Sequence, residues 1–296
     1  MITPRLKKLL KPAVAIIVLV ATIAVFASYI TKHPEIWHQL RQVKLTTMLL
    51  ILALYGVFIV TLAGVQLATL ALCNTKLSRK ENFLLTIYSS IINFFGPLQS
   101  GPGFRAVYLK QKHGTKLKNY TYASLLYYFF FALFSGLLLL SGLIGWWGVL
   151  ALFSLAILCL LLVLRLPFAI IKAINSLNLH QVGWLAVASA AQVMIISLIY
   201  FTELRSLNHH ITFGQTLIYS GAANFAIFVS LTPGAIGFRE SFLLFSRHLH
   251  HIGAGMIATA SLIDRAAYII LLGILFVIVL FVHAKDFLKV KKTATE

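Results

Sequence analysis

Long apolar runs separated by short polar and basic segments make up most of the chain. Six of these runs are long enough for a helix to cross a hydrocarbon core, which takes about 20 residues. They cover residues 12–31, 47–72, 120–141, 146–164, 182–202 and 254–282. Basic residues precede the first run as in a signal peptide, but the run exceeds a signal core of about 7–15 residues, so we expect an uncleaved anchor helix. The pattern predicts an all-α polytopic membrane protein with six transmembrane helices.

Two further apolar segments, 82–98 and 212–232, run into breaks rich in proline and glycine. The first break comprises Asn93, Pro97, Gly101 and Gly103, and the second comprises Asn224, Pro233, Gly234 and Gly237. A short amphipathic stretch follows each break. Irregular backbone at membrane depth is tolerated where it is buried in protein or lines a cavity. We therefore expect two re-entrant helical hairpins besides the six spans, with the two asparagines hydrogen-bonding the freed backbone.

The distribution of basic residues favours re-entrant hairpins over further crossings. If both segments re-enter, 18 of the 25 Lys and Arg residues lie on the cytoplasmic side, six lie outside, and Arg265 lies within a span. If both cross, the split becomes 12 against 12. Since Lys and Arg are enriched in cytoplasmic loops, we expect the re-entrant arrangement, with both termini in the cytoplasm.

The two broken segments share a sequence pattern. Residues 87–94 and 218–225 match at five of eight positions, and Gly-Phe-Arg at 103–105 recurs at 237–239. The first hairpin opens from the cytoplasm and the second from outside, so the halves are inverted. We predict one membrane domain, 1–296, with halves at approximately 1–143 and 144–285 and a short basic cytoplasmic tail at 286–296. Inverted repeats meeting at discontinuous helices are common in transporters, with the binding site near the midplane.

Composition supports the membrane class and argues against others. The chain is 60% hydrophobic and 11% charged, with a mean hydropathy of +0.92, whereas soluble domains contain about 25% charged residues. The net charge is +18, but the basic residues fall in short loops between spans, so we expect contact with lipid headgroups and no nucleic acid. His248, His250 and His251 lack further ligands at metal-binding spacing, so we expect no metal and no cofactor.

Arg105 and Arg239 are the strongest candidates for binding a lipid headgroup. Each follows a break, and the planar guanidinium suits a phosphodiester. The alternative is that either side chain merely anchors at the interface by snorkelling. Arginine within a membrane segment more often has a functional role.

Glu240, Asp264 and Arg265 complete the predicted headgroup-binding set. A charge on a span is costly unless it is paired, and Asp264 and Arg265 point about 100° apart on a helix. We expect a Glu240–Arg265 or an Asp264–Arg239 pair. Such pairs would serve either as a structural lock between the second hairpin and the last span or in gating and headgroup binding. Gln66 and Gln192 are expected to hydrogen-bond between spans.

The two breaks resemble the transmembrane region of the lysylphosphatidylglycerol synthase family, the flippase part of the multiple peptide resistance factor, which also occurs alone. The first signature is similar to the stretch from Asn93 through Pro97 to Arg105 and the basic residues ending at Gly114. The second is similar to residues 232–240, Thr-Pro-Gly-Ala-Ile-Gly-Phe-Arg-Glu, followed by a span carrying Arg265. The resemblance covers nearly the whole chain.

Two departures from the family pattern bear on the ligand. Relatives commonly carry an acidic residue shortly before the arginine of the first hairpin, where this chain has Gly-Pro-Gly-Phe-Arg. The following span has Tyr127 and Tyr128 where an ionisable residue would be expected. Headgroup preference is expected to differ accordingly. The chain stops at Glu296 without a soluble aminoacyl-transfer domain, so the resemblance implies lipid movement without lipid synthesis.

The sequence therefore favours a translocase of the bacterial inner membrane that moves a phospholipid or lipid-linked headgroup. Arg105 would serve the headgroup from inside and Arg239 from outside. One alternative is a membrane accessory protein that binds a lipid-linked glycan or a partner enzyme without transport. The other is an integral-membrane enzyme that modifies lipids with Glu240 or Asp264 as base, although the chain contains no recognisable catalytic motif. A homodimer is left open as the assembly.

Overall fold

The computed structural model describes residues 31, 41, 43–95, 100–164, 179–229, 235 and 238–293. The described part of the chain is helical and contains no strand, as the apolar runs predict. Its helices are α3 (Leu45–Leu72), α4 (Arg79–Phe95), α5 (Ser100–His113), α6 (Leu117–Leu164), α8 (Leu179–Leu207), α9 (Phe213–Val229), α10 (Phe238–Phe245), α11 (Arg247–His250) and α12 (Ala254–Thr293). The predicted span 12–31 lies outside the described residues except for its last residue.

Four described helices are long and apolar enough to cross a membrane: Leu45–Leu72, Leu117–Gly145, His180–Leu207 and Ala254–Val279. They correspond to the predicted spans 47–72, 120–141, 182–202 and 254–282. The predicted span 146–164 is helical and forms the second arm of α6, beyond a kink at Gly145, where φ is +67°. The helix of the predicted span 182–202 continues five residues further, because α8 ends at Leu207.

Apolar side chains cover the outward faces of the spans. Leu49 and Val60 of α3, Phe129 of α6, Val187 of α8 and Ile278 of α12 are between 48% and 60% exposed. A water-soluble protein rarely exposes so much contiguous apolar surface. Lipid chains are as apolar as these side chains, so such faces carry no penalty in a bilayer. The described structure is that of a membrane protein.

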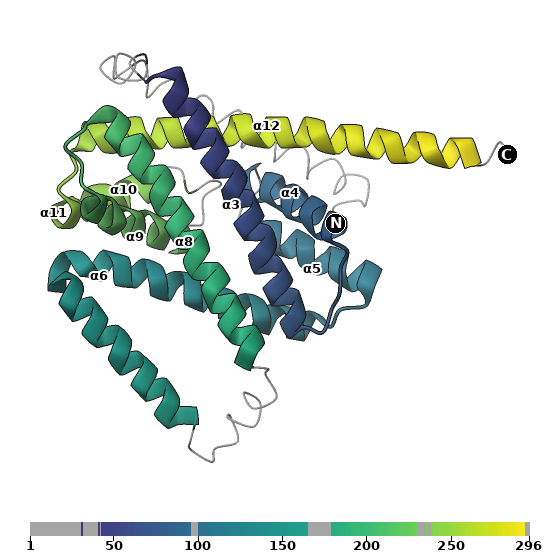
Figure 1. The fold of residues 1–296 in the computed structure, drawn as a ribbon, viewed down its shortest axis with the longest axis horizontal. Helices are drawn as coiled ribbons and strands as arrows, with labels where there is room; N and C mark the ends of the chain where they lie inside the picture. The colour runs from purple at the N-terminus through teal and green to yellow at the C-terminus, as the bar shows by residue number, and fades with distance from the viewer. Residues whose placement is uncertain are drawn as a thin grey trace, which may run out of the picture.

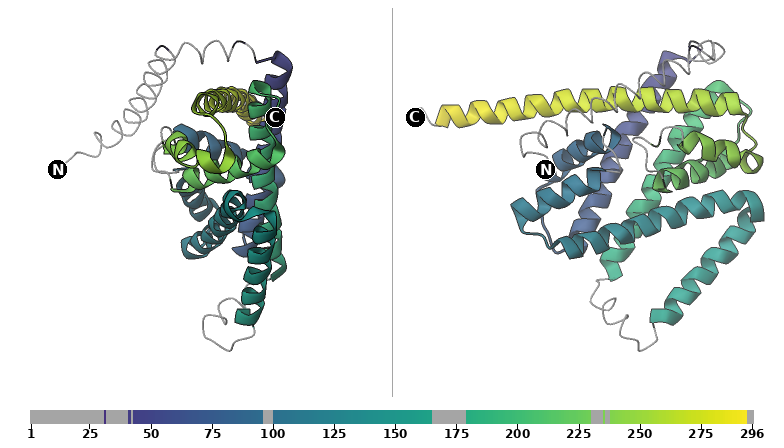
Figure 2. Two further views of the ribbon diagram at one scale, coloured as in Figure 1. Left: turned by 90° about the vertical axis from the view of Figure 1, so that its left-hand side faces the viewer. Right: turned by 180° about the vertical axis from the view of Figure 1, so that it is seen from behind.

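Two long helices form one layer of the molecule, and the broken segments lie behind it. α3 and α8 pack side by side and occupy one face, as Figure 2 (left) shows. Behind them, the first arm of α6 and the long α12 run along opposite sides (Figure 1). The helix pairs α4–α5 and α9–α10 lie between α6 and α12, and each pair packs on itself.

The packing of the first half has a counterpart in the second. α3 contacts α4 and the first arm of α6, and α8 contacts α9 and α12 in the same way. The contacts α3–α12 and α8–α6 also correspond. The pairs α4–α5 and α9–α10 therefore pack against corresponding helices of the two halves. The ends of α4 and α9 meet in the middle of the bundle.

Polar side chains connect the spans, as predicted for the two glutamines. Thr86 of α4 donates a hydrogen bond to Gln66 Oε1 of α3 at 3.0 Å. Tyr127 of α6 donates to Gln192 Oε1 of α8 at 3.1 Å. Hydrogen bonds of this kind hold helices together where burial of apolar surface gives no driving force.

Candidate functional site

A cavity of about 170 Å³ lies where the two broken segments meet the spans. Its polar lining comes from six helices and includes Tyr55, Ser90, Asn93, Tyr200, Asn224, Arg239, Asp264 and Arg265. Aromatic and aliphatic side chains such as Phe58, Phe94 and Ile199 complete the wall. The space is more than ten times the roughly 10–15 Å³ that one water molecule needs on the same measure.

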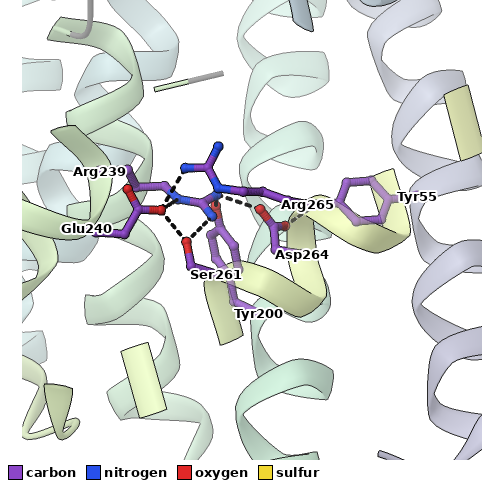
Figure 3. A network of polar contacts seen from close by, with 7 residues as sticks. All are labelled: Tyr55, Tyr200, Arg239, Glu240, Ser261, Asp264 and Arg265. Carbon is purple, nitrogen blue, oxygen red and sulfur yellow. Dashed lines mark hydrogen bonds and ion pairs between the residues drawn. The ribbon is translucent and has the colours of Figure 1, made fainter. Parts of the chain in front are cut away.

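Arg239 is the central cation of this site. It is the second residue of α10 and only 5% exposed. One terminal nitrogen donates to Asp264 Oδ2 at 2.6 Å and to the Tyr200 hydroxyl at 3.2 Å, and the other donates to Ser261 Oγ at 2.7 Å. Figure 3 shows these contacts converging from α8, α10 and α12. The planar guanidinium therefore joins α10 to α8 and α12.

A second ion pair lies beside the first. Arg265 donates to Glu240 Oε1 at 2.7 Å, and the same oxygen accepts a hydrogen bond from Ser261. Asp264 accepts a further hydrogen bond from the Tyr55 hydroxyl of α3. Both pairs expected from the sequence, Glu240–Arg265 and Asp264–Arg239, are thus formed. Consecutive residues of α12 reach different carboxylates because they point about 100° apart.

The four charges balance, which is what burial requires. Two guanidinium groups face two carboxylates, and Ser261 bridges the pairs by accepting from Arg239 and donating to Glu240. Removing one member of a buried pair costs about 3–5 kcal/mol, because the remaining charge stays desolvated.

Glu203 was missed by the sequence analysis. The predicted span ends at residue 202, one residue before Glu203, whereas Glu203 lies in the last turns of α8 and is fully buried. Neither of its carboxylate oxygens receives a hydrogen bond from a described residue. Tyr55, Tyr200 and Ser261 were missed as well, since hydroxyl residues are common in spans and carry no distinctive spacing.

Arg105 does not share the cavity with its sequence counterpart Arg239. It lies in the second turn of α5, half-buried, and its charge acts on Tyr127, Tyr128 and Tyr268. Its Nε is buried without a hydrogen-bond partner among the described residues. The two arginines therefore differ in their partners: both terminal nitrogens of Arg239 are hydrogen-bonded and Asp264 pairs with it, whereas Arg105 has no carboxylate against it in the described part of the chain.

The predicted break residues divide between helices and undescribed segments. Asn93 Oδ1 accepts a hydrogen bond from the backbone N–H of Gly101 at 3.3 Å, as expected. Asn224 instead donates to Ser220 of its own helix at 3.5 Å. Gly101 and Gly103, expected in the break, lie in the first turn of α5, because the chain resumes a helix at Ser100. The remaining break residues lie outside the described residues: Pro97, Pro233, Gly234 and Gly237.

A separate polar cluster joins the start of α4 to the end of α5. Glu81 of α4 accepts hydrogen bonds from Tyr108 at 2.6 Å and Lys112 at 2.9 Å, and contacts His113 Nε2 at 2.8 Å. Desolvation raises the pKa of Glu81, but these hydrogen bonds outweigh it and lower the pKa to about 2. Beside the cluster lies a cavity of about 410 Å³ that Lys80 and Lys112 line.

His250, considered above with its neighbours as a metal ligand, has both ring nitrogens engaged with backbone. Nδ1 accepts from the Ile252 N–H at 3.2 Å, so the neutral ring carries its proton on Nε2 and donates to Leu243 O at 3.1 Å. Burial lowers the pKa of His250 to about 4, with smaller effects from Leu243 O, which raises it, and from His251 and His248. The ring therefore connects α10, as a neutral group, to the segment between α11 and α12.

The fold and site define an all-helical membrane protein with a buried, charge-balanced arginine–carboxylate network at a central cavity. Residues 13–275 match the family described as the lysylphosphatidylglycerol synthase TM region, and the chain belongs to that family. Among curated proteins, none matches the chain. The resemblance of the two breaks to this family is thereby confirmed, and membership points to a role connected with membrane lipid.

Proposed function

We propose that the protein is a flippase-like translocase of a lipid or lipid-linked headgroup and performs no covalent chemistry. The observation that carries this proposal is the cavity at the ends of α4 and α9, into which Arg239, Asp264 and Arg265 face. Arginine binds phosphate through two parallel hydrogen bonds, and membrane-buried ionisable groups usually mark a substrate pathway. Family membership supports lipid as the substrate class.

The proposed binding step is an exchange of anions at Arg239. In the described state Asp264 occupies this guanidinium at 2.6 Å. A headgroup phosphate entering the cavity would take that place and keep the arginine paired, while the Tyr55 hydroxyl continues to hold Asp264. The exchange would loosen α10 from α12, because the Arg239–Asp264 contact is one of the polar links between them. Headgroup binding would thereby be coupled to movement of the second hairpin.

We further propose six spans and two re-entrant hairpins in an inverted repeat, with both termini in the cytoplasm of a bacterial cell. The corresponding packing of α3–α4 and α8–α9 and the basic-residue count support this arrangement. Arg105 would then meet headgroups from the cytoplasmic leaflet and Arg239 from the outer leaflet. The cavity lined by Lys80 and Lys112 would lie at the cytoplasmic mouth of the first hairpin.

Reconstitution into liposomes with labelled lipids tests the function. Changing Arg239 and Asp264 together to Gln and Asn removes both charges and leaves neither one buried alone. We expect translocation to fall about tenfold or more, since a charge-assisted hydrogen bond contributes about 1.5–3 kcal/mol. Arg105→Gln should reduce it similarly. Arg205→Gln is the matched control, because Arg205 is exposed and stacks on Phe201 away from the cavity.

Each outcome of this assay separates the candidate functions. Unchanged translocation in both arginine variants would contradict the assignment of the site. Binding of lipid without translocation of any lipid tested would favour an accessory protein. A chemically altered lipid in the liposomes would favour a lipid-modifying enzyme.

A further inference from the structure

Glu203 is the ionisable group of the site that forms no ion pair with a described residue. Its side chain is fully buried, and both oxygens lack a hydrogen-bond donor among the described residues. The group that lies against it is the Asp264 carboxyl. The other titratable or charged groups that act on Glu203 come from four helices: Tyr55 of α3, Tyr200 of α8, Tyr219 of α9 and Arg239 of α10.

The hydrogen bonds of the site leave no donor for an ionised Glu203. Arg239 directs its terminal nitrogens to Tyr200, Ser261 and Asp264. The Tyr55 hydroxyl is used by Asp264, and the hydroxyls of Tyr200 and Tyr219 form no hydrogen bond with either oxygen of Glu203. A carboxylate buried without any donor would cost several kcal/mol. Two carboxylates side by side would also repel each other.

A proton on Glu203 removes both problems. A protonated carboxyl has an O–H that donates, and Asp264 is the acceptor beside it. Asp264 then has hydrogen bonds from Tyr55 and Glu203 and an ion pair with Arg239, which suits an ionised carboxylate. We infer that Glu203 and Asp264 form a carboxyl–carboxylate pair that binds one proton behind the headgroup cavity.

The proton on Glu203 determines the net charge of the buried site that a headgroup would encounter. With Glu203 neutral, Arg239 and Arg265 balance Glu240 and Asp264. Ionisation of Glu203 would add one negative charge that acts on Arg239 and would oppose an arriving phosphate. This consequence rests on the proposed function: an anionic headgroup should bind only to the protonated site, so loss of one proton should weaken binding by up to tenfold per pH unit.

Infrared spectroscopy of the lipid-free protein at neutral pH tests the proton itself. The wild type should show the carbonyl stretch of a protonated carboxylic acid, and Glu203→Gln should abolish it. Glutamine has nearly the same shape, and its amide can donate to Asp264, so the fold should persist. Asp264→Asn should also abolish the band, because Glu203 is then the carboxyl left to balance Arg239 and should ionise. Glu81→Gln is the control, since Glu81 belongs to the α4–α5 cluster.

Absence of the acid band in the wild type, or its persistence in Glu203→Gln, would overturn the inference whatever the protein transports. A titration with short-chain phosphatidylglycerol then tests the consequence. Wild-type affinity should fall from neutral to alkaline pH, whereas Glu203→Gln should keep its affinity and lose the pH dependence. A slope that survives in Glu203→Gln would refute the link between proton and headgroup. Failure to bind at any pH would count against the proposed function and leave the infrared result standing.

Discussion

At the scale of the residue, His250 shows how burial decides the state of a side chain. The ring is fully buried, faces the edge of Tyr219 at 5.4 Å, and bonds backbone atoms on both sides. Protonation would place an N–H on Nδ1 against the N–H of Ile252, so two donors would meet. The folded protein therefore resists protonation of His250, whereas the unfolded chain takes up the proton near the ordinary pKa of 6.5.

The pH dependence of stability follows from this difference. Between pH 6.5 and about 4 the unfolded state binds the proton and the folded state does not. The contribution of His250 is thus complete above pH 6.5 and is lost as the pH falls, by an amount on the order of 3 kcal/mol. Thermal unfolding in detergent should show a lower Tm at acid pH. His250→Gln should flatten this dependence, while His248→Gln, at an exposed position, should keep it. Equal slopes in both variants would contradict the assignment.

The site shows which residues a sequence can reveal. Charges on spans need partners, so Arg239, Asp264, Glu240 and Arg265 could be identified and paired before the structure was known. The hydroxyl partners could not, because Ser and Tyr on an apolar helix carry no cost that demands an explanation. Glu203 would have been found if the end of its helix had been placed at Leu207, and an error of one turn and a half in a boundary concealed it.

At the scale of the element, Gly101 explains how α4 and α5 come together. A Cβ at this position would lie 2.5 Å from Ser89 O and 2.8 Å from Asn93 Cβ. Both neighbours belong to α4, and one is backbone, so the helices touch at the glycine itself. Gly103, two residues further along α5, has nothing within 4 Å of its position for a Cβ. The sequence assigned both glycines to the break, but only one has a packing role.

The two glycines form a matched pair for mutation. Gly101→Ala should destabilise the protein by about 1–3 kcal/mol, because the backbone of α4 has to move. Gly103→Ala should be neutral or stabilising by up to about 1 kcal/mol, since alanine favours the helix and meets open space. Thermal unfolding of the two variants gives the comparison. A similar loss in both would mean that backbone flexibility, not close approach, is required here.

At the scale of the whole molecule, the two halves pack in corresponding ways. This packing is compatible with either of two arrangements for each broken segment, re-entry on the side it came from or a full crossing of the membrane. The long apolar runs predicted the helices. They could not show on which side of the membrane each helix ends, because the hydropathy of a span is the same whichever way it crosses. The basic-residue count favours re-entry. Three exposed basic residues lie on different sides of the membrane in the different arrangements: Lys112 at the end of α5, Arg205 near the end of α8 and Arg247 in α11.

Single cysteines at these positions, in a chain with Cys73 and Cys159 replaced by alanine, test the arrangement with a membrane-impermeant thiol reagent. Two re-entrant hairpins place Lys112→Cys in the cytoplasm and Arg205→Cys and Arg247→Cys outside. If the first segment crossed instead, Lys112→Cys would be labelled from outside and Arg205→Cys from inside. If the second crossed, Arg205→Cys and Arg247→Cys would be labelled from opposite sides. Each hairpin is therefore tested separately, and the inverted repeat requires both to give the re-entrant result.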